Sequence, residues 1–224
     1  MAKNQWTSYL LEQVRQLPIV SSKEQVQFRL NTITSEALRQ EEVIPPEFEH
    51  IFQAYLQARS GKLIDAISLF FDAINFAQQN KQEFLICFSH YNIGTLYGML
   101  GNYFYAQQFL TKAEKSQQFC DGYITGIIKN NIGDIFRQLG NFNEALKHLT
   151  EATTLLEQYG PKLSTALSLF NIAEIKAKQC HFDEAIAILN TLFNDIKDEP
   201  RFLGFYYKIK AEIANGQEKI EEAE

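Results

Sequence analysis

The sequence predicts an all-α fold, a right-handed superhelical solenoid of antiparallel helix pairs. The first observation is a repeated phrase of asparagine, isoleucine and a small residue, with spacings of 39 and 40 residues, at 92–94, 131–133 and 171–173. In each copy an alanine follows 14 residues after the asparagine, at Ala106, Ala145 and Ala185. A fixed period of this length is typical of stacked helical repeats. The second observation is that the chain has only 11 Gly and 5 Pro, which is few for an all-β protein with many turns.

Residues 1–44 predict an N-terminal helical pair that is either a cap or a degenerate repeat. A first helix, ended by Pro18, is predicted by an apolar stripe that comprises Trp6, Leu10, Leu11, Val14 and Leu17. Ser21 and Glu24 have the spacing of a capping box, which opens a second helix. The stripe of that helix comprises Val26, Leu30, Ile33 and Ala37, and Pro45-Pro46 stops it.

Residues 45–224 predict an array of about five helix-pair units, of which the last is truncated. The units begin near Glu47, Cys87, Gly126, Ala166 and Gly204. A corner divides each pair, clearest at Gly101-Asn102 and Gly140-Asn141, because Gly tolerates the left-handed backbone that ends one helix and Asn can cap the next. The final unit stops partway through its second helix, so we expect the sequence to be a fragment of a longer protein.

Small residues predict where the two helices of a pair touch. Gly94 in a first helix and Ala106 in the second must let the backbones approach closely, because a larger side chain would hold the pair apart. A bulky side chain at Ala106 or Ala145 is therefore expected to overpack the interface.

These features resemble the tetratricopeptide repeat (TPR) family. The family's pattern of a large residue, Leu-Gly, an aromatic, Ala, a large apolar residue and Ala is matched by Ile93, Gly94, Tyr97, Ala106, Leu110 and Ala113, and again by Ile132, Gly133, Phe136, Ala145, Leu149 and Ala152. The resemblance covers about residues 47–224. The usual Trp is replaced by His50, His90, Lys129 and Leu169, and the period of about 40 residues exceeds the common one of about 34. The resemblance implies a non-catalytic module that holds an extended peptide or partner segment in a concave groove.

Composition excludes several other classes of function. The net charge is −6, and no basic run could follow a phosphate backbone, so no direct nucleic-acid partner is expected. The N-terminus lacks a signal-peptide core, and no apolar run approaches about 18 residues. We therefore expect a cytoplasmic protein that does not enter a membrane. Three widely spaced cysteines suit a reducing compartment and are interpreted as packing residues.

Motifs for catalysis, metals or cofactors are not found in the sequence. The four histidines lack the spacing of metal ligands, and His50 and His90, at the same place in successive units, are interpreted as packing residues. Glycines occur singly at helix corners rather than in a phosphate-binding loop. The sequence therefore predicts no enzyme, no metal and no cofactor.

The candidate binding residues lie on the inner row of the first helices. This row comprises Tyr91, Asn92, Thr95 and Met99, then Asn130, Asn131, Asp134, Arg137 and Gln138, then Phe170, Asn171, Glu174 and Lys178. An Asn amide can pair with both the C=O and the N–H of an extended peptide, so the ladder of Asn92, Asn131 and Asn171 predicts peptide binding. In the TPR family an Asn at this place commonly contacts the bound peptide. The alternative is that these amides bond neighbouring helices.

Apolar contact and charge refine this hypothesis. Hydrogen bonds contribute only about 0.5–1.5 kcal/mol each, so Tyr91, Phe170 and Met99 are expected to add apolar contact, and Phe205 is expected to face the groove as well. Arg137 and Lys178 are expected to pair with Asp134 and Glu174, one turn earlier on each helix. The family's clamp for a C-terminal carboxylate needs several unpaired cations, so that mode is not expected.

Two other functions compete with peptide binding. One is a regulatory domain of a larger bacterial signalling protein, with a nucleotide cyclase or DNA-binding output beyond Glu224. The other is a self-assembly scaffold, a homo-oligomer formed through exposed solenoid ends.

Overall fold

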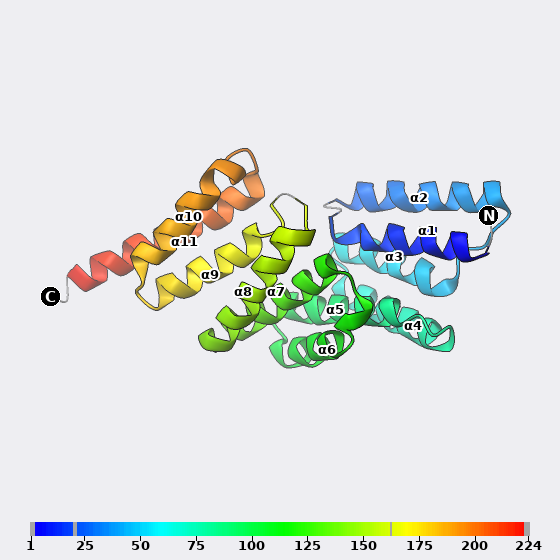
Figure 1. Ribbon diagram of the computed structural model, residues 1–224, viewed down its shortest axis with the longest axis horizontal. Helices are drawn as coiled ribbons and strands as arrows, with labels where there is room; N and C mark the ends of the chain where they lie inside the picture. Colours follow the sequence, from blue (N-terminus) through cyan, green and yellow to red (C-terminus); the bar gives the residue numbers. More distant parts are fainter. Residues whose placement is uncertain (1–2, 20–21, 162, 222–224) are drawn as a thin grey trace. The chain divides into compact units, whose positions relative to one another are not determined.

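The computed structural model describes residues 3–19, 22–161 and 163–221, and every regular element in these ranges is a helix (Figure 1). The all-α fold class is therefore confirmed. The chain divides into two compact units, residues 1–120 and residues 121–224, which are described separately. None of the described helices is long and apolar enough to cross a membrane.

The first unit contains an N-terminal pair followed by two further pairs. Its elements are α1 (Lys3–Arg15), the 3-10 helix η1 (Leu17–Ile19), α2 (Lys23–Gln40), α3 (Pro46–Arg59), α4 (Leu63–Gln79), α5 (Glu83–Met99), α6 (Tyr103–Lys115) and the 3-10 helix η2 (Gln117–Phe119). Helices α3 and α4 form one antiparallel pair and α5 and α6 the next, with α4 also packed on α5. The largest fully buried side chains include Phe48, Phe52, Phe70 and Phe88, so aromatic rings from three helices fill this core.

The N-terminal pair follows the predicted stripes, with two differences. Both stripes are buried except for Leu11, which is half-exposed. Helix α1 ends at Arg15, and Pro18 lies in η1 rather than directly after the helix. The capping box of α2 uses Ser22 and Gln25, whereas the predicted Ser21 lies outside the described residues. The pair is anchored to the rest of the unit by Trp6, whose Nε1 donates to the Val43 carbonyl at 3.1 Å.

The second unit contains two pairs and one long helix. Its elements are α7 (Gly122–Gln138), α8 (Phe142–Tyr159), α9 (Ala166–Lys178), α10 (Phe182–Ile196) and α11 (Pro200–Glu221). Helices α7 and α8 form one pair and α9 and α10 the next, and α11 packs against both α9 and α10. One core cluster joins the last three helices through Phe170, Leu189, Phe202 and Ile209.

The predicted close approaches are confirmed at the two best-matched repeats. A Cβ at Gly94 would lie 2.7 Å from Leu110 Cγ and 3.1 Å from the Ala106 carbonyl oxygen of α6. A Cβ at Gly133 would lie 2.6 Å from Leu149 Cγ and 3.1 Å from the carbonyl oxygen of Ala145 in α8. Such distances are shorter than ordinary contacts, so only Gly allows these helix pairs to pack at their observed separation.

The corners are also built as predicted, with one exception. Gly101 and Gly140 have φ values of 73° and 76°, in the left-handed region where Gly carries no Cβ penalty. Asn102 caps α6, because its side chain accepts a hydrogen bond from the Tyr105 amide. Asn141 occupies the same place before α8 but makes no side-chain cap bond.

The last predicted unit differs from the structure. A second helix was expected there, but α11 runs unbroken from Pro200 to Glu221. The chain also enters α11 four residues before the predicted unit start at Gly204. Gly216 does not interrupt α11, where it packs directly on the Phe182 ring of α10. The side chain of Ile220 and all of Ala223, which were expected in the second helix, lie outside the described residues.

Candidate functional site

Most of the predicted site residues of the first unit make hydrogen bonds within that unit. Tyr91 is 4% exposed, and its hydroxyl lies 3.1 Å from that of Tyr55 on α3. Asn92 is 8% exposed, and its Nδ2 donates to the Phe88 carbonyl one turn earlier at 2.8 Å. The expectation that Tyr91 offers apolar contact to a ligand is therefore wrong for this structure, because its ring packs between neighbouring helices.

Two further predicted residues of α5 differ from each other. The Thr95 hydroxyl donates to the Tyr91 carbonyl at 2.9 Å, a bond within the same helix. Met99 is well exposed at the end of α5, beside the corner that precedes α6. In the first unit the predicted row thus presents one exposed apolar side chain, while its amide and its tyrosine are buried.

The second unit carries a polar strip that continues across three helices. Residues at helical spacing share one face of a helix, and the strip repeats this spacing on each of them. We define the polar strip as Asn131, Asp134 and Gln138 of α7, Asn171, Glu174 and Lys178 of α9, and Phe205, Lys208 and Glu212 of α11. Helix α9 contacts both α7 and α11, so the three rows are neighbours.

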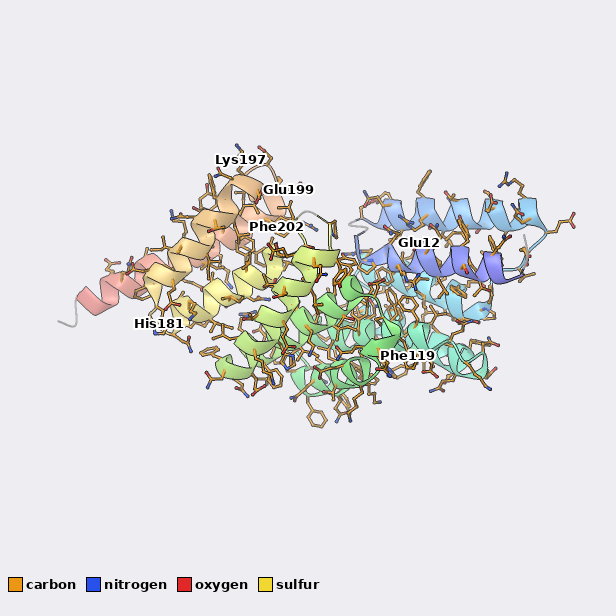
Figure 2. The ribbon with its side chains drawn as sticks, viewed as in Figure 1. Glu12, Phe119, His181, Lys197, Glu199 and Phe202 are labelled. Carbon is orange, nitrogen blue, oxygen red and sulfur yellow. The ribbon has the colours of Figure 1, made fainter. Side chains whose placement is uncertain are left out.

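Two phenylalanines were expected to face the groove here, and the structure exposes Phe205 but buries Phe170. Phe170 was expected to contact a ligand, but it is 2% exposed because its ring packs against Phe202 and Phe205 of α11. Figure 2 labels Phe202 near the start of α11. Phe205 stacks on Phe170 with ring centroids 5.8 Å apart and is 46% exposed. Phe205 is therefore the aromatic side chain that the strip offers to solvent, as the sequence predicts.

A buried ion pair holds the centre of the strip. Arg137 Nη1 lies 2.6 Å from Glu174 Oε1, which joins α7 to α9, and both side chains are less than a tenth exposed. Arg137 also binds Asp134 at 2.6 Å, and Glu174 binds Lys178 at 2.9 Å, which confirms both predicted pairings within a helix. Lys208 Nζ lies 3.3 Å from Glu174 Oε2 and joins α9 to α11. Glu174 therefore contacts three cations from three helices.

These cations decide the ionisation of Glu174. Burial alone would raise the pKa of this carboxyl, but the hydrogen bond from Lys178 and the charges of Arg137, Lys178 and Lys208 lower the pKa below its usual value. The carboxylate is thus ionised at neutral pH. The buried Arg137 together with Lys178 and Lys208 of the strip balances the three anions Asp134, Glu174 and Glu212.

The amides of the strip differ in their hydrogen bonding. Asn131 Oδ1 accepts a bond from Asn130 Nδ2 at 3.2 Å, so these neighbours bond each other. The half-exposed side chain of Asn171 makes no hydrogen bond to the part of the chain that the structure describes. An unpaired amide that is partly removed from water favours a partner that can supply both a donor and an acceptor.

Lys208 and Glu212 were missed by the sequence analysis. The repeat period places the last unit at Gly204, whereas α11 begins at Pro200 and brings Lys208 level with Glu174. Proline is favoured at the first position of a helix, so Pro200 was the signal that could have located this start. Among the described residues, no group of three or more His, Cys, Asp or Glu side chains could hold a metal ion.

Comparison with protein families locates the repeats within this unit. Residues 125–194, from α7 to α10, match the tetratricopeptide repeat family. This part of the chain carries tetratricopeptide repeats. Within residues 125–194, the paired helices, the contact between Gly133 and Ala145 and the corner at Gly140 are therefore those of TPR units, and the TPR fold commonly mediates protein–protein interaction. No match was found among curated proteins.

Solved structures share the fold of this chain. The crystal structure of BtubC (BKLC) from P. vanneervenii is 14% identical, with a TM-score of 0.61 over 84% of this chain and 91% of that one. Another crystal structure is of a kinesin light chain from Podosopora anserina whose TPR-like repeats are nearly identical to one another. It is also 14% identical to this chain, with a TM-score of 0.58 over 79% of this chain and 93% of that one. At such identities the likeness extends to the TPR fold alone.

Proposed function

We propose that the chain is a non-catalytic binding module whose polar strip in the second unit holds an extended segment of a partner protein. The observation that carries the proposal is Asn171, whose half-exposed amide has no hydrogen-bond partner in the described chain. The α7 row and the α11 row flank it on either side. A peptide backbone supplies one C=O and one N–H per residue, which matches what a single Asn amide can bond.

Phe205 supplies the apolar contact that backbone hydrogen bonds alone would lack. It is the exposed aromatic side chain of the strip, and its ring is held in place by Phe170 beneath it. Aromatic side chains held rigidly in this way are frequent anchors in protein interfaces. The segment would therefore place an apolar side chain over Phe205 and its backbone beside Asn171.

The balanced charge of the strip favours a segment of mixed or low net charge. Lys178 and Lys208 are about half exposed, but both already bind Glu174. An acidic segment would have to compete with that carboxylate for the same ammonium groups. Recognition would thus depend on backbone hydrogen bonds and one apolar anchor rather than on charge.

The experiment is a peptide-display selection against the full chain, followed by dissociation constants for the best synthetic peptide measured by fluorescence anisotropy. Asn171→Ala is expected to weaken binding about fivefold, the equivalent of about 1 kcal/mol. Phe205→Ala is expected to weaken it more strongly. The matched control is Asn143→Ala with Asn190→Ala, which removes two exposed amides from α8 and α10. Equal affinity in Asn171→Ala, Phe205→Ala and the control would reject the proposal.

A further inference from the structure

Two thiols of the first unit meet in space although they are 33 residues apart in the sequence. Cys87 lies on α5 and is fully buried, whereas Cys120 follows η2 and is partly exposed. Their Sγ atoms are 3.1 Å apart, with Cys120 donating to Cys87. Figure 2 labels Phe119, the last residue of η2, which directly precedes Cys120.

Backbone hydrogen bonds hold both cysteines in this position. Cys87 Sγ donates to the Ala113 carbonyl of α6 at 3.3 Å, so its thiol is oriented by the second helix of its own pair. The turn of η2 is closed by the Cys120 amide, which donates to the Gln117 carbonyl at 2.9 Å. The third cysteine, Cys180, is exposed at the corner between α9 and α10 in the second unit.

We infer that Cys87 and Cys120 form a reversible disulfide when a hydroperoxide oxidises the protein. In the first step the partly exposed Cys120 thiolate attacks one peroxide oxygen; with hydrogen peroxide this gives the sulfenic acid and hydroxide. In the second step Cys87 sulfur attacks the sulfenic sulfur, the S–S bond forms, and the sulfenic oxygen leaves as water. Two thiols and one peroxide thus give one disulfide and two water molecules.

The geometry favours this bond over other oxidation products. A disulfide bond is about 2.05 Å long, so the two sulfur atoms need to approach by only about 1 Å from their separation of 3.1 Å. A resolving thiol already in contact would capture the sulfenic acid before more peroxide could oxidise it to the sulfinic acid. A dithiol reductant would reverse the bond by attack at the exposed Cys120 sulfur.

Oxidation would close a loop within the first unit. The disulfide would tie α5 to the residue that directly precedes Asp121, the N-cap of α7. Closing a loop of this size reduces the entropy of the unfolded chain, so the oxidised first unit is expected to unfold at a higher temperature. This inference is independent of the peptide-binding proposal, because neither cysteine belongs to the polar strip.

The test treats the reduced full chain with equimolar hydrogen peroxide, stops the reaction with acid, and then unfolds the protein with N-ethylmaleimide for mass spectrometry. The three cysteines take up three adducts before oxidation. After oxidation we expect one adduct, on Cys180, a peptide containing Cys87 joined to Cys120, a monomer on a non-reducing gel, and a higher melting temperature. Dithiothreitol is expected to restore three adducts and the original melting temperature.

Two variants and one treatment serve as controls. Cys180→Ser is expected to form the same linkage and to fall from two adducts to none. Cys120→Ser is expected to keep Cys87 alkylatable and to show no change in melting temperature, with circular dichroism confirming its fold. Peroxide treatment in guanidinium should give mixed linkages, since the geometry is then lost. A folded chain in which Cys87 stays alkylatable, while Cys120 becomes sulfinic acid or joins Cys180 of another copy, would overturn the inference.

Discussion

Arg137 of α7 and Glu174 of α9 form a buried ion pair, with Nη1 and Oε1 2.6 Å apart. The pair joins the first helices of two successive repeats, and Asp134 and Lys178 complete it from the same two helices. It therefore fixes the step from one repeat to the next at the centre of the proposed binding surface. Its energetic role follows from burial, because a charge left without its partner in this position is costly.

Removal of one partner of this pair is expected to destabilise the second unit more than removal of both. Glu174→Leu leaves Arg137 buried with Asp134 alone and should cost about 3 kcal/mol. Arg137→Met combined with Glu174→Leu should cost less than either single change, because neither of the two buried charges remains. Urea unfolding of the wild type, both single variants and the double variant measures the coupling energy. Strictly additive costs would contradict a direct interaction between the two side chains.

Substitution by alanine is expected to have opposite effects at two glycines, because Gly133 of α7 packs closely on α8 whereas Gly204 of α11 has open space beside it. Gly133→Ala places a methyl group 2.6 Å from Leu149 Cγ and should destabilise by about 1–3 kcal/mol through overpacking. At Gly204 of α11 a Cβ meets no atom within 4 Å, so Gly204→Ala should stabilise by about 0.5–1 kcal/mol. Thermal unfolding compares the two variants. Equal shifts in the same direction would show that the pairing distance is not as described.

The helix caps of the second unit predict unequal effects of two similar changes. Asp121 Oδ1 accepts a hydrogen bond from the Ile124 amide at 2.9 Å, so Asp121→Ala should lower stability by about 1 kcal/mol. Asn141 makes no side-chain cap bond at the start of α8, and Asn141→Ala should change stability by less than about 0.5 kcal/mol. Chemical denaturation distinguishes them, and a larger loss at Asn141 would contradict the assigned caps.

His90 predicts a loss of stability in mild acid. Burial, and then the nearby Lys112, lower the pKa of its ring from 6.5 to about 4. The unfolded chain therefore takes up a proton between pH 6.5 and 4 that the folded chain does not, so stability falls as pH decreases through this window. Because solvent screens the partly exposed ring, the expected loss in the free energy of unfolding is about 1–2 kcal/mol.

The matched variant for this effect is His90→Gln, which keeps a polar side chain but cannot titrate. Urea unfolding at several pH values should show a shallower dependence for His90→Gln than for the wild type between pH 6.5 and 4. Identical slopes in the two proteins would mean that His90 is not the titrating group.

Much of the fold could be predicted because each repeat places the same kinds of residue at its helix contacts and at its corners. Gly94 and Gly133 indicated where helices of a pair touch, and Gly101 and Gly140 indicated where the first helix ends. The end of the array was less predictable. A second helix was expected in the last unit, but α11 runs unbroken from Pro200 to Glu221, and the loop before Pro200 is shorter than the repeat period implies.

The candidate site could be predicted within each helix but not between helices. Helical spacing predicted that Asp134 pairs with Arg137, and Glu174 with Lys178, as observed. The ion pair between Arg137 and Glu174 depends on how α7 packs against α9, which helical spacing within one repeat does not predict. Equivalent positions in successive repeats also meet different neighbours.

The residue before each repeated asparagine illustrates this difference in surroundings. Tyr91 packs against Tyr55, and Phe170 packs against two rings of α11, so both are buried. Asn130, at the same place in the middle copy, bonds its neighbour Asn131 instead. Repetition therefore identified the row, while the packing of each copy decided which members face solvent.

The most direct test of the proposed function is to map the bound peptide on the protein. The full chain, labelled with nitrogen-15, is titrated with the peptide obtained by selection, and amide chemical shifts are followed by NMR. We expect the largest shifts along the polar strip, at Asn131 and Gln138 of α7, Asn171 and Lys178 of α9, and Phe205 and Lys208 of α11. Shifts confined to the exposed faces of α8 and α10, with the polar strip unchanged, would contradict the account.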